Sequence, residues 1–277
     1  MNTPLELRQY VWEGPYAQWR AGAAHDPGLC ADARAQWMSP GERLILRSCE
    51  MIGDPGFFLY DDHTPPAEPQ TRGAGYKHVP FRWDARRAPT ELSVDADVPN
   101  QARFGVVLSS RQDYIDIQLR IANTQQVSLV PIDWSFCVIA LESPALRDPQ
   151  QTRTFIYEGQ TLRSFAELRV DSGITLIPIA GGNGFAPAVH AHLPRAATQT
   201  MASVTIVESR DARHCAAIGF EQSYNAFGCS GNMCFHADPY FGTLSPGEDK
   251  TVHGRLYLIE GDRHEALRRY RSDFADR

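Results

Sequence analysis

Two segments in which apolar and polar residues strictly alternate limit what this chain can fold into. They cover residues 91–98, ELSVDADV, and residues 114–123, YIDIQLRIAN. A period of two puts every second side chain on one face of an extended backbone, which is typical of a half-buried strand in an antiparallel sheet. The apolar positions that share a face are Leu92, Val94, Ala96 and Val98 in the first segment and Ile115, Ile117, Leu119 and Ile121 in the second.

Shorter apolar segments continue the pattern along the chain and are separated by turns rich in Gly, Pro and Asn. They read RLILRSC, FGVVLS, VSLV, WSFCVIAL, TFIY, ITLIPIA, SVTIVE and GRLYLIE. No long helical pattern stands between them, so the sequence predicts an all-β fold, a large antiparallel β-sandwich. A length of 277 residues suits a single sandwich domain over residues 1–277.

One helix is expected, near the C-terminal end. The segment 262–274, DRHEALRRYRSDF, begins with Asp262 as an N-cap and has Glu265 three residues later, and Ala266, Leu267, Tyr270 and Phe274 form its apolar stripe. Residues 61–90 are rich in Pro and Gly and are expected to form a long loop.

Composition excludes several classes of protein. The net charge is −6, so nucleic acid is not an expected partner. No apolar run approaches the roughly 20 residues that cross a bilayer, and the first residues have no signal-peptide pattern, so we expect a cytoplasmic protein without a membrane partner. The six cysteines contain no C-x-x-C pair, which favours free thiols in a reducing compartment.

The segment NMCFHADPYFG, residues 232–242, supplies the main catalytic candidates. If residues 235–238 are extended, His236 and Asp238 share a face, and the carboxylate can orient the imidazole as an acid/base dyad requires. Pro239 is expected to limit strand pairing by Asp238 and to keep both side chains near the surface. The alternative is an Asx-type turn at Asp238, in which His236 bonds to a backbone carbonyl.

A second histidine pair lies in VHAHL, residues 189–193. His190 and His192 point to the same side of a strand, where they can chelate a metal ion or act as an acid and a base. Glu221, at the end of the apolar segment CAAIGF, is a candidate base or ligand. With His236, these residues are the expected ligands if a divalent metal ion is present; otherwise no cofactor is expected. The alternative is two surface histidines and an exposed strand-end carboxylate.

An aromatic and basic segment, GYKHVPFRWDARR at residues 75–87, is the predicted sugar-binding surface. Aromatic rings stack on the apolar faces of sugars, and arginine binds hydroxyls and carboxylates. Tyr76, Arg82 and Trp83 are the candidates here, and Tyr224 and Tyr240 complete the expected substrate-binding set. The alternative is a solvated basic loop.

Two stretches resemble a known superfamily. LSPGEDKTVHGRLYLIEG, residues 244–261, resembles the late segment of galactose-mutarotase-like β-supersandwich proteins, in which L-x-PGE precedes a long strand. HADPYFGTL, residues 236–244, resembles the His-Pro-Tyr-Phe type segment of aldose epimerases, although that segment lies mid-chain there and near the C-terminus here. Together they cover about a tenth of the chain.

The resemblance implies a supersandwich fold and an enzyme that moves protons on a sugar: a mutarotase, an epimerase or a lyase. Carried over, it makes His236 or His192 the general acid and a carboxylate the base, with Glu221 the nearest candidate. Three alternatives stay open: a non-catalytic carbohydrate-binding module, a metal-dependent sugar lyase or isomerase, and an interaction subunit without a pocket. The expected ligand is a small sugar or an oligosaccharide, and the sequence does not indicate an oligomeric state.

Overall fold

The computed structural model describes residues 4–11, 13–15, 30–53, 58–61, 82–168, 174–179 and 199–274. These residues form two eight-stranded sheets, and every ladder between their named strands is antiparallel. In order, sheet A contains β1 (Glu6–Gln9), β2 (Cys30–Arg34), β3 (Leu44–Gly53), β8 (Leu129–Ile139), β15 (Cys234–Leu244), β14 (Ser223–Cys229) and β11 (Ile174–Pro178), and β4 (Phe58–Asp61) pairs with β3.

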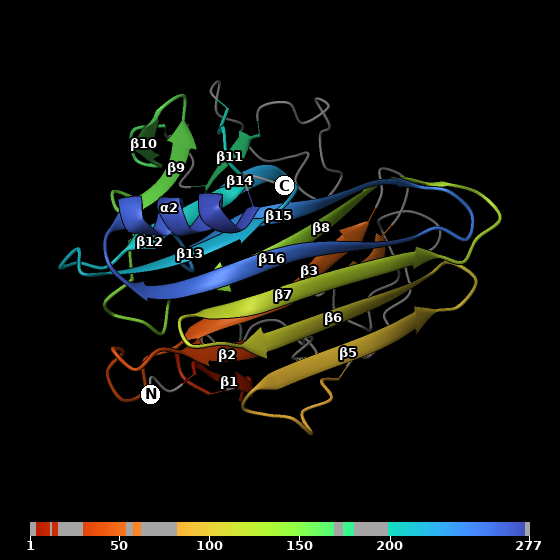
Figure 1. Ribbon diagram of the computed structural model, residues 1–277, viewed down its shortest axis with the longest axis horizontal. Helices are drawn as coiled ribbons and strands as arrows, with labels where there is room; N and C mark the ends of the chain where they lie inside the picture. Colours follow the sequence, from red (N-terminus) through yellow and green to blue (C-terminus); the bar gives the residue numbers. More distant parts are fainter. Residues whose placement is uncertain are drawn as a thin grey trace.

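Sheet B lies against sheet A, and the two form the predicted sandwich (Figure 1). In order, sheet B contains β10 (Thr161–Ser164), β9 (Thr154–Glu158), β12 (Val204–Glu208), β13 (His214–Phe220), β16 (Asp249–Glu260), β7 (Tyr114–Asn123), β6 (Ala102–Ser110) and β5 (Glu91–Val98). The two alternating segments become β5 and β7, and their apolar positions are buried as predicted. The expected fold class is therefore confirmed.

The main core fills the space between the sheets. Sheet A contributes Trp134 and Phe136 of β8 and Phe235 of β15, and sheet B contributes Phe104 of β6 and Phe220 of β13. Since side chains alternate along a strand, the neighbours of these residues on β8 and β15 point to the opposite face of sheet A. That outer face carries the candidate site described below.

The predicted C-terminal helix is present as α2 (Arg263–Phe274). It lies across β12 and β13 of sheet B (Figure 1). Oδ1 of Asp262 accepts hydrogen bonds from the backbone N–H groups of His264 and Glu265, both at 3.0 Å, so Asp262 is the N-cap. The four predicted apolar residues are buried, and they share a cluster with residues of β9, β12, β13 and β16.

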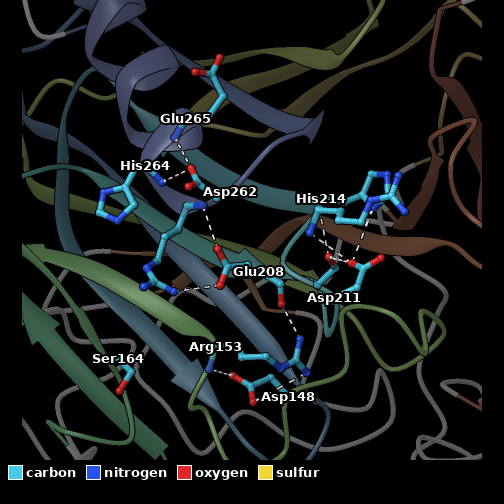
Figure 2. A network of polar contacts seen from close by, with 12 residues as sticks. Asp148, Arg153, Ser164, Glu208, Asp211, His214, Asp262, His264 and Glu265 are labelled. Carbon is cyan, nitrogen blue, oxygen red and sulfur yellow. Dashed lines mark hydrogen bonds and ion pairs between the residues drawn. The ribbon is translucent and has the colours of Figure 1, made fainter.

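A buried carboxylate fastens the start of α2 to sheet B. Oε1 of Glu208 accepts a hydrogen bond from the backbone N–H of Arg263 at 3.0 Å, and its Oε2 accepts one from the Arg263 guanidinium at 2.9 Å. Figure 2 shows Glu208 between Asp262, at the start of α2, and Arg153, whose guanidinium donates to the Glu208 carbonyl. The negative charge faces the positive end of the helix dipole, which stabilises this arrangement.

The prediction that Pro239 keeps His236 and Asp238 out of a sheet is wrong. β15 is an unbroken strand in the middle of sheet A, paired with β14 and β8, and neither an Asx-type turn nor a surface loop is formed. The proline is tolerated because the ladder with β14 shifts register between Ser223 and Asn225, opposite Pro239. Such a bulge is one of the few places in a sheet that can accept a residue without an N–H group.

Of the expected loop at 61–90, only Asp61, the last residue of β4, and residues 82–90 belong to the described part of the chain. There, Asp84 forms an isolated bridge with Ser93 of β5, and the turn that follows is exposed. Within the described residues, no helix is long and apolar enough to cross a membrane.

Candidate functional site

A cluster of polar and ionisable side chains lies on the outer face of sheet A. Four neighbouring strands contribute to it, and all of its members are buried. We call it the outer-face cluster; its residues are Arg47 and Glu50 of β3, Ser135 and Cys137 of β8, Asn225 of β14, and His236 and Asp238 of β15.

His236 is held between two carboxylates. Its Nδ1 lies 3.1 Å from Oδ1 of Asp238 and 3.4 Å from the hydroxyl of Ser135, and its Nε2 lies 3.9 Å from Oε2 of Glu50. The ring of Phe227 packs edge-on against the imidazole at 4.7 Å between centroids. The side chains of His236 and Asp238 are only 1% and 0% exposed, so water screens these contacts very little.

Backbone contacts fix the position of this pair. Oδ1 of Asp238 also accepts a hydrogen bond from the backbone N–H of Phe136 at 3.1 Å. The carbonyl of His236 accepts one from the hydroxyl of Thr205 in sheet B. Because both residues also belong to a central strand, their side chains are positioned by a rigid part of the fold.

Arg47 and Glu50 reach the same face because β3 is irregular. Residues three apart in a regular strand point to opposite faces, but the register of β3 against β8 shifts between Arg47 and Met51. The Arg47 guanidinium donates a hydrogen bond to Oε1 of Glu50, and the Ser135 hydroxyl donates one to Oε2 at 2.8 Å. Glu50 is therefore oriented on both oxygens.

The surroundings favour a protonated His236. Burial alone lowers the pKa of His236, but the negative charges of Cys137 and Asp238, together with their hydrogen bonds, raise it well above its usual range. In the same cluster, burial raises the pKa of Cys137, while a hydrogen bond from Cys234 and the charge of His236 lower it to about 7. This direction of the pKa shift favours the protonated imidazole, the form that can donate a proton.

Asn225 places an amide without hydrogen-bond partners beside His236 and Asp238. It is 1% exposed, and it lies directly opposite Asp238 across the β14–β15 ladder. Neither its Nδ2 nor its Oδ1 has a hydrogen-bond partner among the residues that the structure describes. Because a buried amide is costly when its bonds are unmade, this side chain is suited to a polar ligand.

The structure places Glu221 away from His236. Glu221 lies in the connection between β13 and β14, and its Oε1 accepts a hydrogen bond from the backbone N–H of His253 in sheet B at 2.9 Å. The carboxylates that face His236 are Glu50 and Asp238 instead. His190 and His192 lie outside the described residues, so the expected grouping of the three histidines with a carboxylate stays a prediction.

The predicted stacking role of Trp83 is wrong. Trp83 is 7% exposed, belongs to the main core, and donates its indole N–H to the carbonyl of Cys30 at 3.0 Å, so no face is open to a sugar. Arg82 is exposed next to it. Tyr76 lies outside the described residues.

The two predicted tyrosines lie near the cluster. Tyr240 is half-buried on β15, two residues after Asp238 and therefore on the same face. Tyr224 is buried on β14, next to Asn225. Contact of either tyrosine with a sugar stays a prediction.

Three donor atoms in this region are close enough to approach one metal ion. They belong to Cys137, Cys234 and His236, and they lie within 4.8 Å of one another. A closed structural zinc site uses four ligands, so this group falls one short and we assign no ion to it. The expected ligand set of His190, His192, Glu221 and His236 stays a prediction, because His190 and His192 lie outside the described residues.

Sequence reasoning missed Arg47, Glu50 and Asn225. The signal for the first two was present, since two opposite charges stand in a mostly apolar strand, LILRSCEMIG. Charged residues are almost never fully buried unless they are paired, so an Arg and a Glu within one buried strand indicate a polar cluster. Asn225 has no such signal, because it reaches this face through the register of β14.

Solved structures similar to this chain include a galactose mutarotase-like protein from Lactobacillus casei (9% identity, 86% of this chain and 95% of that chain covered, TM-score 0.45), a galactose mutarotase related enzyme from Lactobacillus acidophilus (9%, 87% and 90%, 0.38) and an aldose epimerase homologue from C. elegans (9%, 67% and 70%, 0.35).

Because the identities are near 10% and the TM-scores are below 0.5, the chemistry of this chain has to be argued from its own residues. No protein-family model matches the sequence, and neither does any curated protein.

Proposed function

We propose that this protein is an enzyme of acid/base chemistry on a small sugar, and that the reaction is the interconversion of the two anomers of an aldose. The observation that carries the proposal is the position of His236, with Asp238 at Nδ1 and Glu50 3.9 Å from Nε2. This arrangement puts a proton donor and a carboxylate acceptor side by side on a rigid sheet.

Anomer interconversion needs such a pair. The pyranose ring opens when the ring oxygen gains a proton and the hydroxyl on C1 loses one, and the ring closes by the reverse transfers. Both oxygens are bonded to the same carbon, so an acid and a base only a few ångströms apart can serve them together. In this proposal His236 donates to the ring oxygen and Glu50 accepts the hydroxyl proton.

The neighbouring residues would support these two roles. Asp238 fixes the imidazole through Nδ1, which directs Nε2 toward the substrate. Arg47 and Ser135 hold the two oxygens of Glu50. The amide of Asn225, which can both donate and accept, would bind a sugar hydroxyl.

Burial of the cluster has a consequence for binding. His236 and Asp238 are almost fully covered, so a sugar reaches them only if the atoms that cover them move. When the covering atoms close over the bound sugar, water is excluded from the site. The charges on the acid and the base then act more strongly on the substrate than they would in solution.

Exchange NMR tests the proposal. Two-dimensional exchange spectra of glucose, galactose and mannose solutions, recorded with and without the protein, report how fast the α and β anomers interconvert. We expect exchange cross-peaks with at least one of these aldoses, at a rate well above the uncatalysed one. Line broadening without exchange would instead indicate a carbohydrate-binding module, and unchanged spectra with all three sugars would contradict the proposal.

A further inference from the structure

Three thiols form a continuous chain of contacts that ends at the candidate site. Cys229 on β14 hydrogen-bonds with Cys234 on β15, Cys234 with Cys137 on β8, and Cys137 with His236. None of the six cysteines forms a disulfide in this structure. Cys229 is the only one of them that is partly exposed; the other five are buried.

We propose that Cys229 and Cys234 are an oxidisable thiol pair, in which a peroxide oxidises Cys229 and Cys234 then closes a disulfide with it.

The backbone already has the right geometry for this bond. Cys229 and Cys234 are register partners in the β14–β15 ladder, on either side of the turn at residues 230–233. Directly opposite residues in an antiparallel pair have their Cα atoms about 4.5–5.5 Å apart. A disulfide spans Cα separations of about 4.4–6.8 Å, so the strands need not move for the bond to form.

The turn between the strands prepares Cys229 to react. Its sulfur accepts a hydrogen bond from Cys234 and further ones from the backbone N–H groups of Asn232 and Gly231. Against the opposing effect of burial, these bonds lower the pKa of Cys229 to about 6. A thiolate in a nest of N–H groups at a partly exposed turn is the environment typical of a reactive cysteine.

Cys234 has the properties of the resolving partner. It is 6% exposed, and burial, followed by its hydrogen bonds to Cys137 and Cys229, raises its pKa well above the usual range. The proton therefore stays on Cys234 while Cys229 is the thiolate. A cavity of about 10 Å³, at the lower limit for a single water, is lined by both cysteines and Met233.

The reaction balances with hydrogen peroxide as the oxidant. The Cys229 thiolate attacks one peroxide oxygen, an S–O bond forms, the O–O bond breaks, and the leaving hydroxide takes up a proton to give water. The sulfenic acid on Cys229 is then attacked by the sulfur of Cys234, which loses its proton. An S–S bond forms, the S–O bond breaks, and a second water leaves.

The Cys229–Cys234 disulfide would affect His236 through Cys137, which lies between Cys234 and His236. In the disulfide, Cys234 no longer has the one thiol proton that it shares between Cys229 and Cys137, and Cys137 is the group that touches His236. Oxidation of the pair would therefore change the surroundings of His236. The modification site itself does not depend on the proposed sugar chemistry.

Peptide mapping of the folded wild-type protein tests the proposal without any variant. The protein is treated with a small excess of hydrogen peroxide, blocked with an alkylating reagent, digested without reduction and analysed by mass spectrometry. We expect a peptide in which Cys229 is joined to Cys234, the loss of two of the six titratable thiols, and recovery of both with a thiol reductant.

Three variants assign the roles. Cys234→Ser should stop at a sulfenic acid on Cys229, which a dimedone probe traps, and Cys229→Ser should slow the loss of thiols at least tenfold. Cys215→Ser removes a buried thiol of sheet B and should give the wild-type disulfide. A disulfide between Cys137 and Cys234, oxidation of Cys229→Ser at the wild-type rate, or a wild-type protein that keeps all six thiols would overturn the proposal.

Discussion

Oδ1 of Asp238 lies 3.1 Å from Nδ1 of His236, two residues earlier on the same strand, and both side chains are buried. Such a pair costs free energy to bury unless it is fully compensated, and here the compensation comes from Phe136, Ser135 and Glu50. The arrangement fixes the imidazole in one orientation with its second nitrogen toward another carboxylate.

The first prediction concerns the charge of His236. Nitrogen-15 NMR of the imidazole should show both ring nitrogens protonated at neutral pH, because Cys137 and Asp238 raise the pKa of His236 against the effect of burial. Asp238→Asn should lower that pKa. Since the folded-state pKa is raised, the protonated imidazole stabilises the fold fully below its unfolded pKa, and this contribution is lost as pH rises through the folded value. A neutral His236 at neutral pH would contradict this account.

The second prediction separates ligand binding from stability at Asn225. Its amide has no hydrogen-bond partner among the described residues. Asn225→Ala should therefore lower the free energy of unfolding by no more than about 1 kcal/mol, the contribution of side-chain packing. If the amide binds a sugar hydroxyl, the same variant should raise the KM for the sugar about tenfold and change kcat less. Steady-state kinetics and urea denaturation measure the two effects; an unchanged KM would remove Asn225 from the site.

The third prediction concerns pH and Asp32. Burial raises the pKa of Asp32 to about 6, although the guanidinium groups of Arg43 and Arg8 lower it in part, and Glu142 and Glu6 add to the rise. A raised carboxyl pKa means that this group destabilises the fold progressively as pH rises from about 4 to about 6. Asp32→Asn should therefore stabilise the protein above that window, by up to about 3 kcal/mol.

Denaturant titrations of wild type and Asp32→Asn across this pH range measure the effect. Asp97→Asn is the matched control, because Asp97 is exposed on the outer face of sheet B, and it should change stability by less than about 0.5 kcal/mol. If Asp32→Asn is less stable than wild type at every pH, the contact of the Asp32 carboxylate with Arg43 outweighs the cost of burying that carboxylate.

The fourth prediction concerns the attachment of α2. Glu208 binds both the backbone N–H and the guanidinium of Arg263, and it is buried, so Glu208→Ala should cost about 2–3 kcal/mol of unfolding free energy. Glu265→Ala removes an exposed ion pair with Arg268 on the same helix and should cost less than about 1 kcal/mol. Equal losses in urea denaturation would mean that Glu208 is not the anchor.

The strands and the helix followed from local patterns. The period of two at 91–98 and 114–123, and the N-cap at Asp262 with its apolar stripe, are properties of neighbouring residues, and the structure has them where they were expected. The position of Trp83 was not predictable in this way. A tryptophan among arginines is compatible with a surface loop, but tertiary packing buries it in the main core, where its indole N–H bonds to β2.

The site depended on long-range register. His236 and Asp238 could be paired from their spacing, but Glu50 comes from a strand far away in the sequence and reaches the cluster through a register shift, and Asn225 joins it by pairing opposite Asp238 on β14. Such bulges leave no clear trace in a hydrophobic pattern. Pro239 was misleading for the same reason, because its effect on pairing depends on the bulge in the neighbouring strand.

The anomer exchange rate of the His236→Gln variant tests the central claim most directly. It is measured by exchange NMR on the aldose that the wild type converts, normalised to folded protein, and compared with His253→Gln, which changes an exposed histidine of sheet B. We predict that His236→Gln lowers the catalysed rate by about 10²–10⁴-fold, the usual effect of removing a general acid, while His253→Gln keeps the wild-type rate. A folded His236→Gln protein with the wild-type exchange rate would contradict the account.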